Sequence, residues 1–456
     1  MELRKAMYTI GLDIGTTTIC GVAADAASGA VVMTRSRRHS FAPAAQPYAK
    51  VQDAQEIVRM TDEILQELLD ACPQVCGIGL TGQMHGIVYT DREGNALSPL
   101  ITWQDGRGNL CAPGGQRTYA QQLSEVTGDF CASGYGAVTL YTDLQMGNVP
   151  RGAARIVTIP DYYRMHLCCE AAAVTHPSLA ASMGLFDAAA EKFDQEKAAC
   201  AKIPCEMLPD VREAYISHTR SGIPVFGALG DNQASFLGSV REPDKSILVN
   251  IGTGSQLTLA IDAPAATENC ETRPYLSGRF LAVGSSLCGG RSYALLEKLF
   301  REAATMAGAP DPADLYEAMN ARALACAGEN LTVCTEFCGR RRAPLERGSI
   351  TGISESNFDV AHLAVGFLSG CIEELYGYYR ELSPLAGERS ILVGSGNGIR
   401  KNPVMRRLLT QRFKMPLCLP LYEEEAAYGS ALYAISRAEG GREVSGLIRF
   451  EEQKGI

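Results

Sequence analysis

Two short turns rich in glycine and threonine carry residue types that bind phosphate groups. The first is Gly15-Thr16-Thr17, just after Asp13, and the second is Gly252-Thr253-Gly254. Glycine lets backbone N–H groups approach an anion, threonine hydroxyls add donors, and an aspartate can hold a divalent cation directly or through its waters. Gly-Thr hairpins also occur without any ligand. Because two of them lie roughly half a chain apart, the pair predicts a nucleotide whose phosphates are held from two sides.

Asp231 is a second acidic residue in a position that chemistry could use. An apolar strand is predicted over residues 223–229, and residues 233–237 read as helix. An acid at such a junction is often only a helix cap. The partial positive charge of a helix N-terminus also predicts a weakly basic carboxylate, since that charge stabilises the ionised form. Residue type and spacing therefore leave both a structural and a chemical role open.

The elements that must position these residues follow an α/β pattern, because short apolar β-branched runs alternate with helical periodicity. Each Gly/Thr turn joins two predicted strands, within residues 9–19 and within residues 247–257. This approximate repeat predicts two similar α/β halves that each open with a hairpin.

Further elements are predicted from apolar spacing and from cap signals. A helix over residues 55–71 and a strand over residues 75–80 follow the first hairpin, and a strand is predicted at 390–393. A long helix is predicted from Val360, with Asn357 as its cap. Another helix opens at Asn402, in the order of a cap followed by a proline.

Composition excludes several classes of protein. The chain has 456 residues, 46% hydrophobic and 20% charged, with a net charge of −9. This is typical of a globular protein of two or three domains, and the acidic balance argues against nucleic acid as a partner. Since no stretch resembles a membrane span or signal peptide, a cytoplasmic location is expected. The 16 cysteines lack C-x-x-C spacing and the six histidines do not cluster with them, so reduced, mostly buried thiols are predicted rather than zinc ligands.

Three tempting signals are set aside. No G-x-x-x-x-G-K-[ST] motif occurs, and the G-x-G-x-x-G at residues 77–82 lies in a predicted strand that runs into another extended stretch, residues 83–89. A dinucleotide fingerprint must instead open a helix. The basic clusters Arg35-Arg37-Arg38 and Arg340-Arg341-Arg342 are interpreted as solvated surface.

Taken together, the motifs resemble the FGGY family of carbohydrate kinases along nearly the whole chain. The resemblance rests on an opening D-x-G-T-T, a second phosphate segment, a G-x-G-x nucleotide region and a closing acidic helix. These match residues 13–17, 250–256, 394–398 and 424–431 in that order. Each motif is short, but their order and spacing together are specific.

Within that family, residues 82–86 and 103–107 are similar to ketose kinases, namely sedoheptulokinases and xylulokinases. Trp103-Gln104-Asp105 stands where xylulokinases usually have Trp-Asn-Asp. This form, the motif at residues 230–235 and the short chain look more like sedoheptulokinases. The resemblance implies ATP-dependent phosphorylation of a ketose at its terminal hydroxyl, with sedoheptulose as the first expectation and D-xylulose as the alternative.

The resemblance also implies a fold and a set of partners. The expected architecture is a pair of ribonuclease-H-like, actin-like ATPase domains with the active site in the cleft between them. Residues 1–237 would form an N-terminal domain that mainly binds sugar, and residues 238–456 a C-terminal domain that mainly binds ATP. ATP and Mg²⁺ are the expected cofactors. The expected partner is a small-molecule ketose, with no nucleic acid or membrane, and the protein would be a monomer or homodimer.

Site roles are carried over by matching residues. Asp231 would be the catalytic base and would accept the hydroxyl proton late, since phosphoryl transfer depends more on alignment and charge neutralisation than on early proton removal. Asp13 and Asp231 would lie near the metal. The implied sugar-binding residues are Gln83, Met84, His85, Trp103, Gln104, Asp105, Arg107 and Asn232. The implied ATP-binding residues are Gly15, Thr16, Thr17, Gly252, Thr253, Gly254, Gly290, Gly396, Asn397 and Asn402.

Structural interpretations compete with several of these roles. Trp103 is the only tryptophan, and a lone tryptophan or methionine, such as Met84, is more often a core residue. His85 could be a structural imidazole, and Asp105 and Arg107 could simply pair with one another. At the level of the whole chain, the alternative is a non-enzymatic nucleotide switch in the manner of actin or heat-shock ATPases. Such a switch would need no polar sugar pocket.

Overall fold

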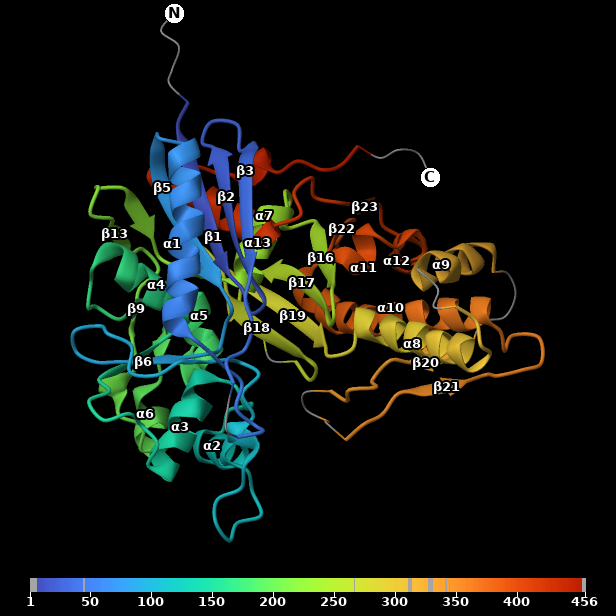
Figure 1. Ribbon diagram of the computed structural model, residues 1–456, viewed down its shortest axis with the longest axis horizontal. Helices are drawn as coiled ribbons and strands as arrows, with labels where there is room; N and C mark the ends of the chain where they lie inside the picture. Colours follow the sequence, from blue (N-terminus) through green and yellow to red (C-terminus); the bar gives the residue numbers. More distant parts are fainter. Residues whose placement is uncertain are drawn as a thin grey trace, which may run out of the picture. The chain divides into compact units, whose positions relative to one another are not determined.

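The chain forms two compact units, each with one large sheet. The computed structural model describes residues 6–43, 46–265, 267–310, 314–326, 331–340, 343 and 345–452. The first unit comprises Met1–Arg241, Arg273–Gly278 and Glu424–Ile448, and the second comprises Glu242–Thr272, Arg279–Glu423 and Arg449–Ile456. The first unit therefore takes its last helix from the far end of the chain (Figure 1).

The sheet of the first unit has the strand order β13-β14-β5-β1-β2-β3, with β15 paired to β5. β1 pairs antiparallel with β2 and parallel with β5, which also runs parallel to β14 and β15. β1 and β2 are buried almost throughout, because helices cover both faces of the sheet. The strands are β1 (Tyr8–Ile14), β2 (Thr18–Asp25), β3 (Val31–Arg38), β5 (Val75–Gly82), β13 (Ile216–His218), β14 (Pro224–Phe226) and β15 (Leu229–Gly230).

Helix α1 (Ala54–Ala71) covers one face of this sheet. Asp53 caps the helix by accepting from the N–H groups of Gln55 and Glu56, and the apolar stripe from Ile57 to Leu68 is buried. Gly21 of β2 leaves room for Ile64 and Leu68, since a Cβ there would lie 2.5 Å from Ile64. The predicted helix over 55–71 and the predicted strand over 75–80 are both confirmed.

The other elements of the first unit include several that contribute to a second apolar cluster, with Ile87, Leu123, Leu140 and Met183 among its members. They are β4 (Val51–Gln52), β6 (Val88–Thr90), β7 (Leu100–Ile101), α2 (Tyr119–Thr127), α3 (Gly136–Met146), β8 (Arg155–Val157), α4 (Ile159–Cys168), β9 (Val174–Thr175), α5 (Pro177–Met183), β10 (Phe186–Asp187), β11 (Lys192–Phe193), α6 (Gln195–Cys200), β12 (Asp210–Val211), α7 (Asp231–Ser239) and α13 (Glu425–Ala438).

The sheet of the second unit has the order β18-β19-β17-β16-β22-β23. Its strands are β16 (Ser246–Ile251), β17 (Ser255–Ile261), β18 (Cys270–Pro274), β19 (Phe280–Ser286), β22 (Ile391–Ser395) and β23 (Leu417–Cys418), and β20 (Thr332–Cys334) pairs with β21 (Ser349–Thr351). The helices are α8 (Gly290–Met306), α9 (Leu315–Ala325), α10 (Val360–Ala386), α11 (Asn397–Arg400) and α12 (Pro403–Phe413).

The two sheets repeat one pattern of pairing, which confirms the prediction of two similar halves. β16 pairs antiparallel with β17 and parallel with β22, as β1 does with β2 and β5. Each Gly/Thr turn is the connection of its opening hairpin, between β1 and β2 and between β16 and β17. The two turns therefore occupy equivalent places in the two units.

Helix α13 packs very closely on the first sheet and on α7 (Figure 1). A Cβ added to Gly11 of β1 would lie 2.0 Å from the carbonyl oxygen of Ala427, and one added to Gly79 of β5 would lie 1.9 Å from that of Ser430. Gly238 of α7 and Gly429 of α13 face each other in the same way. Glycine is needed at these positions because main chain touches main chain.

Two sequence predictions are wrong in detail. The long helix α10 is capped by Asp359, which accepts from the N–H groups of Ala361 and His362. Asn357 instead braces the preceding loop, where it donates to the Gly352 carbonyl. Residues 83–87 do not continue as strand, since His85 has a φ of 74° and regular pairing resumes only at β6. Within the described ranges, no helix is long and apolar enough to cross a membrane.

The packing of α13 generates a prediction for stability. In Gly429→Ala the new Cβ would lie 1.8 Å from the Ala234 carbonyl oxygen, so we expect a loss of at least about 2 kcal/mol in the free energy of unfolding. Gly377→Ala is the matched control, because it also lies within a helix and its Cβ would meet nothing within 4 Å. It should be neutral or stabilising by up to about 1 kcal/mol. Equal melting temperatures for the two variants would contradict this account.

Candidate active site

Two carboxylates of the first unit act electrostatically on a third, that of Asp13. Asp13 is in β1, Asp231 is the first residue of α7, and Glu424 is the N-cap of α13. Oδ1 of Asp13 is buried and has no hydrogen-bond partner among the described residues. Burial and the charges of Asp231 and Glu424 raise the pKa of Asp13 to about 8. The packing of β1, α7 and α13 therefore brings two further negative charges within electrostatic range of Asp13.

Asp231 is a stronger base than its place at a helix terminus predicts. Burial raises its pKa, against the opposing effects of Arg273 and of the N–H of Asn232, which donates to Asp231 Oδ1 at 2.7 Å. The N-cap is Gly230, so Asp231 does not cap the helix by its own side chain. The expectation of a weak base is wrong, because it counted the helix end and left out the loss of water around the carboxylate.

A buried pair of side chains fixes the residue before Asp231. Ser178 Oγ accepts from the N–H of Gly230 at 3.0 Å and lies 2.8 Å from Nδ1 of His176. Both residues are buried, and burial lowers the pKa of His176 to about 3, which keeps the imidazole neutral. Neither residue was among the sequence candidates.

Trp103 joins the predicted sugar residues to the first Gly/Thr turn. Its indole N–H donates to Thr16 Oγ1 at 2.9 Å, and the residue is 39% exposed. Gln83 Oε1 lies 3.4 Å from the same hydroxyl. The interpretation of Trp103 as a core residue is wrong, because one face of the chain's only tryptophan is left open to solvent beside a phosphate-type turn.

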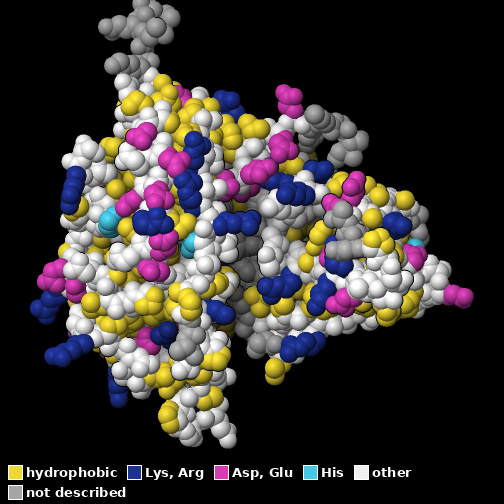
Figure 2. All heavy atoms as spheres, viewed as in Figure 1, with side chains coloured by type: hydrophobic (Ala, Val, Ile, Leu, Met, Phe, Trp, Pro, Cys, Tyr) yellow, Lys and Arg dark blue, Asp and Glu magenta, His cyan; other side chains and the backbone are white. Residues whose placement is uncertain are grey.

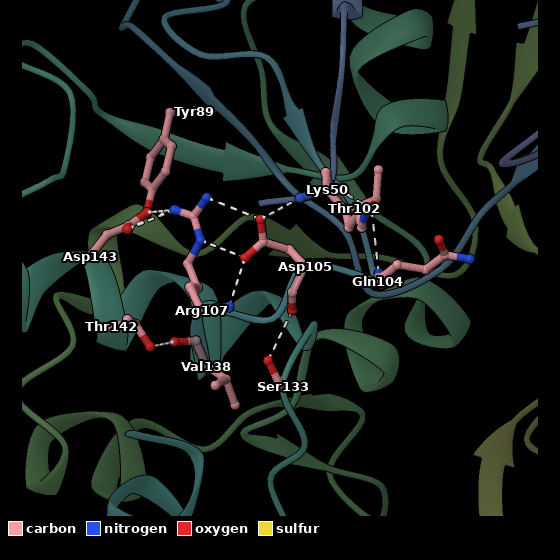
Figure 3. A network of polar contacts seen from close by, with 10 residues as sticks. All are labelled: Lys50, Tyr89, Thr102, Gln104, Asp105, Arg107, Ser133, Val138, Thr142 and Asp143. Carbon is pink, nitrogen blue, oxygen red and sulfur yellow. Dashed lines mark hydrogen bonds and ion pairs between the residues drawn. The ribbon is translucent and has the colours of Figure 1, made fainter. Parts of the chain in front are cut away.

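Asp105 and Arg107 form an ion pair within a larger network (Figure 3). Arg107 Nε donates to Asp105 at 2.8 Å and its Nη1 donates to Asp143 at 2.7 Å, while Tyr89 donates its hydroxyl to Asp143. Asp105 also accepts from the N–H groups of Lys50 and Arg107. Gln104 is exposed, and Figure 3 shows its side chain extending away from this network. The ion pair between Asp105 and Arg107 that the sequence suggested is present, and the guanidinium of Arg107 lies between the carboxylates of Asp105 and Asp143.

His85 is held in an unusual backbone conformation. Its N–H donates to Ser182 Oγ at 3.0 Å, its Nδ1 donates to the Ser182 carbonyl at 2.6 Å, and its ring stacks on Tyr135 at 4.7 Å. Because a carbonyl only accepts, Nδ1 of His85 carries a proton. Met84 is buried, and a Cβ on Gly230 would lie 2.9 Å from its sulfur. Asn232 is buried directly after Asp231.

In the second unit, the turn at residues 252–254 lies against the start of α8. Gly290 donates its N–H to the Gly252 carbonyl at 2.9 Å, and Arg291 donates its N–H to that of Thr253 at 3.0 Å. A Cβ on Gly396, which has a φ of 81°, would lie 2.6 Å from the carbonyl oxygen of Ile251. The structure thus brings Gly290 and Gly396 to the strand and turn that contain Gly252.

Asn397 and Asn402 have different surroundings. Asn397 is exposed at the start of α11. Asn402 is buried and caps α12, where its Oδ1 accepts from the N–H of Met405 at 3.0 Å, as its sequence context predicts. A role of Asn402 toward ATP stays a prediction, and its capping bond already uses its side-chain oxygen.

The basic clusters and the cysteines lie outside this arrangement. Arg35 and Arg37 both pair with Glu67 of α1, Arg340 pairs with Glu346, and Arg341 and Arg342 fall outside the described residues. On the face shown in Figure 2, basic and acidic side chains are interspersed. All 16 cysteines are free thiols and three are exposed, namely Cys111, Cys169 and Cys200. Across the described parts of the chain, no group of three or more His, Cys, Asp or Glu side chains is placed to hold one metal ion.

Comparison with known proteins assigns this site to a family. The N-terminal domain of the FGGY family of carbohydrate kinases matches residues 8–238, and the C-terminal domain of that family matches residues 247–438. The chain belongs to the FGGY family of carbohydrate kinases. It is therefore a phosphotransferase that acts on an alcohol group, and this assignment decides against the non-enzymatic nucleotide switch.

Several relatives of this FGGY kinase have names or solved structures. Sedoheptulokinase of Mus musculus is 28% identical over 94% of this chain and 97% of its own length. A xylulose kinase from Lactobacillus acidophilus superposes with a TM-score of 0.84 at 20% identity, covering 98% of this chain and 93% of the other. Glycerol kinase of Plasmodium falciparum, solved with ADP, gives 0.80 at 18% identity over 98% and 94%. The likeness in structure confirms the two-domain, actin-like ATPase fold with a mixed sheet in each domain.

Several residues of the site could not be found from motifs. Gln52, His39, Ser178 and Asp143 all contact predicted site residues, yet each is a single polar residue without a motif around it. Glu424 was recognised only as part of an acidic segment. Gln52 stands just before the helix predicted over residues 55–71, and this position carries no information on its partner.

The raised pKa of Asp13 predicts how stability depends on pH. The folded protein holds a proton up to about pH 8, whereas an unfolded aspartate releases it near pH 4. The folded state then binds more protons between these values, so Asp13 lowers stability progressively as pH rises from about 4 and levels off above about 8. Asp13→Asn removes the effect. Its melting temperature in the ligand-free protein should exceed that of the wild type by more at pH 8 than at pH 5.

The control for this measurement is Glu355→Gln, at a residue exposed to solvent. A difference between Asp13→Asn and wild type that stays constant from pH 5 to pH 8 would show that Asp13 is ionised in the folded protein throughout.

Proposed function

We propose that this FGGY kinase transfers the γ-phosphate of ATP to the terminal hydroxyl of sedoheptulose, giving sedoheptulose 7-phosphate. The sequence similarity to sedoheptulokinase extends over nearly the full length of both chains. The observation that carries the proposal is the hydrogen bond from Trp103 to Thr16, because it places a partly exposed indole against the turn proposed to bind phosphate. The structural likeness to xylulose kinases keeps D-xylulose as the competing substrate.

Asp231 is the proposed catalytic base. Its raised pKa suits a group that accepts a proton from the attacking hydroxyl as the phosphoryl group is transferred. Asp231 also orients that hydroxyl, which matters because phosphoryl transfer depends mainly on alignment and electrostatic stabilisation. Ser178 and His176 would hold the Gly230 end of α7 still during the reaction.

The residues around Asp13 fit a magnesium ion. Asp13 has a buried oxygen without a hydrogen-bond partner among the described residues, and Asp231 and Glu424 add negative charge around it. Mg²⁺ usually takes one or two protein carboxylates and fills its other positions with phosphate oxygens and water. Asp13 and Asp231 would hold it, and the bound ion would neutralise charge on the transferring phosphate. Phosphate oxygens are assigned to the N–H groups of both Gly/Thr turns, with Gly290, Gly396 and Asn397 as further nucleotide contacts.

The proposed sugar pocket combines one apolar face with several hydrogen-bonding groups. The exposed part of Trp103 suits the C–H-rich side of a polyol, and the His85 ring, held at Nδ1 by the Ser182 carbonyl, is a further polar group of the pocket. Gln83, Gln104, Asn232 and the Asp105–Arg107 pair supply polar groups, and Met84 packs beneath Gly230. Arg107 is held by two carboxylates, so its direction is set before a sugar binds.

Asp231→Asn tests the assignment of the base. The substitution keeps the shape of the side chain but removes the proton acceptor, and we expect turnover to fall by about 10² to 10⁴-fold with ATP binding retained. Coupled ADP release measures turnover, and calorimetry with a nonhydrolysable ATP analogue measures binding. Asp70→Asn, at an exposed carboxylate of α1, should keep wild-type turnover. A variant at position 231 that keeps more than about a tenth of wild-type turnover would exclude Asp231 as the base.

The substrate is tested with the chain's only tryptophan as the reporter. A ketose that stacks on Trp103 should change its emission by excluding water from the indole. We expect sedoheptulose to saturate the change at a lower concentration than D-xylulose or D-ribulose, and to be phosphorylated with the highest kcat/KM. A lower saturating concentration and higher kcat/KM for D-xylulose would favour the competing substrate. If no sugar changes the emission, with or without the ATP analogue, the sugar pocket is misplaced.

A further inference from the structure

Gln52 lies where the first Gly/Thr turn and the proposed sugar pocket meet. The residue is completely buried, yet its amide is fully engaged. Nε2 donates to the Thr16 carbonyl at 2.7 Å, and Oε1 accepts from Gln83 Nε2 at 2.9 Å. Its backbone belongs to β4, which pairs antiparallel with β7, the strand that leads into Trp103. One side chain thus contacts the phosphate turn and a proposed sugar residue at once.

The partners of Gln52 determine how each amide is oriented. A peptide carbonyl can only accept, so Nε2 of Gln52 faces Thr16 and Oε1 faces Gln83. Gln83 must then present its own oxygen to Thr16 Oγ1, which already accepts from the Trp103 N–H. The hydrogen bonds therefore run in one direction from residue to residue, and Gln52 is the member that donates to the Thr16 carbonyl.

A second side chain acts on the neighbouring peptide of the turn. His39 Nε2 donates to the Gly15 carbonyl at 2.8 Å, and its Nδ1 lies 3.4 Å from Nε2 of Gln52. Since Nδ1 is then the acceptor, the tautomer of His39 is set by the same arrangement. His39 and Gln52 together hold two successive carbonyl groups of the turn.

Because the peptide group is planar, fixing the carbonyl groups of the turn also fixes the directions of its N–H groups. In a trans peptide the carbonyl and the N–H of the following residue point in opposite directions. Fixing the carbonyls of Gly15 and Thr16 therefore directs the N–H groups of Thr16 and Thr17 away from His39 and Gln52. Within the described chain, neither N–H donates to another group. Two adjacent free N–H groups that point the same way are a site for an anion.

We infer that Gln52 is a positioning residue that sets the anion-binding N–H groups of the Gly15–Thr17 turn and, through Gln83 and Thr16, the orientation of Trp103. The inference rests on the proposed function for the identity of the ligands on the two sides, a nucleotide phosphate and a ketose. Gln52 would contact neither of them. It would make the affinity for phosphate and the conformation of the sugar pocket depend on one buried amide.

Gln52→Met is the primary test, because methionine nearly matches the shape of glutamine and has no amide to donate or accept. We expect the affinity for a nonhydrolysable ATP analogue, measured by calorimetry, to weaken about tenfold. We also expect the emission of Trp103 to change in the ligand-free protein, because Thr16 loses the group that holds its peptide. The ketose KM should rise at the same time.

Two controls separate positioning from loss of stability. Gln66→Met changes an exposed amide on α1 and should leave both readouts unchanged. Ile64→Val removes a buried methylene from the same core and lowers the melting temperature without touching the turn. If Gln52→Met lowers the melting temperature as Ile64→Val does but leaves nucleotide affinity and Trp103 emission at wild-type values, Gln52 is a structural residue only and the inference is wrong.

Gln52→Glu keeps the test usable if the methionine variant does not fold. An ionised glutamate can still accept from Gln83 but cannot donate to the Thr16 carbonyl, so nucleotide affinity should again fall by about tenfold. Unchanged affinity in this variant would overturn the inference. Nucleotide affinity and the Trp103 emission of the ligand-free protein are both measured without a ketose. Absence of ketose phosphorylation by the wild type would therefore contradict the proposed substrate and leave the role of Gln52 standing.

Discussion

The close packing of α13 on β1, β5 and α7 is the constraint on which the site depends. Glycines at these contacts bring main chain against main chain, and at Gly429 even one methyl group has no room. Asp13, Asp231 and Glu424 lie in or at the ends of three of these elements, so the separation of the helices from the sheet sets the distances among the carboxylates. The spacing of these carboxylates therefore depends on close packing at glycines, which have no side chain.

This packing has an electrostatic cost in the ligand-free protein. Burial raises the pKa of both Asp13 and Asp231, and the negative charges of Asp231 and Glu424 raise that of Asp13 further. Such a site is most stable when a cation or a proton neutralises it. Function and stability of the ligand-free protein are thus opposed at Asp13, as is common where a site is built for a charged ligand.

Sequence reasoning reached the fold and most of the short motifs because their signals are local. A Gly/Thr turn, the stripe of α1 and the cap-proline start of α12 are each set by a few adjacent residues. Asp359, rather than Asn357, caps α10 because two acceptors stand within one turn of each other, and spacing alone does not choose between them. Strand register and helix capping are decided by differences as small as the one between these two acceptors.

The partners of the site residues could not be predicted, because they come from distant parts of the chain. Gln52 meets Thr16 and Gln83, Asp143 meets Arg107, and each pair is formed only after the sheets and loops are in place. The exposure of Trp103 could not be predicted either. Composition indicates only that a lone tryptophan is usually buried, whereas the loop that contains Trp103 leaves it partly exposed.

The discontinuous first unit has a consequence for synthesis on the ribosome. Residues 424–448 complete a sheet-and-helix layer whose first strand, β1, is synthesised long before them. Until that last segment is released, Gly11 and Gly79 face no helix and the apolar surface they belong to is uncovered. The N-terminal unit therefore cannot complete its packing until most of the second unit has been made, and an apolar surface left uncovered for that time favours aggregation.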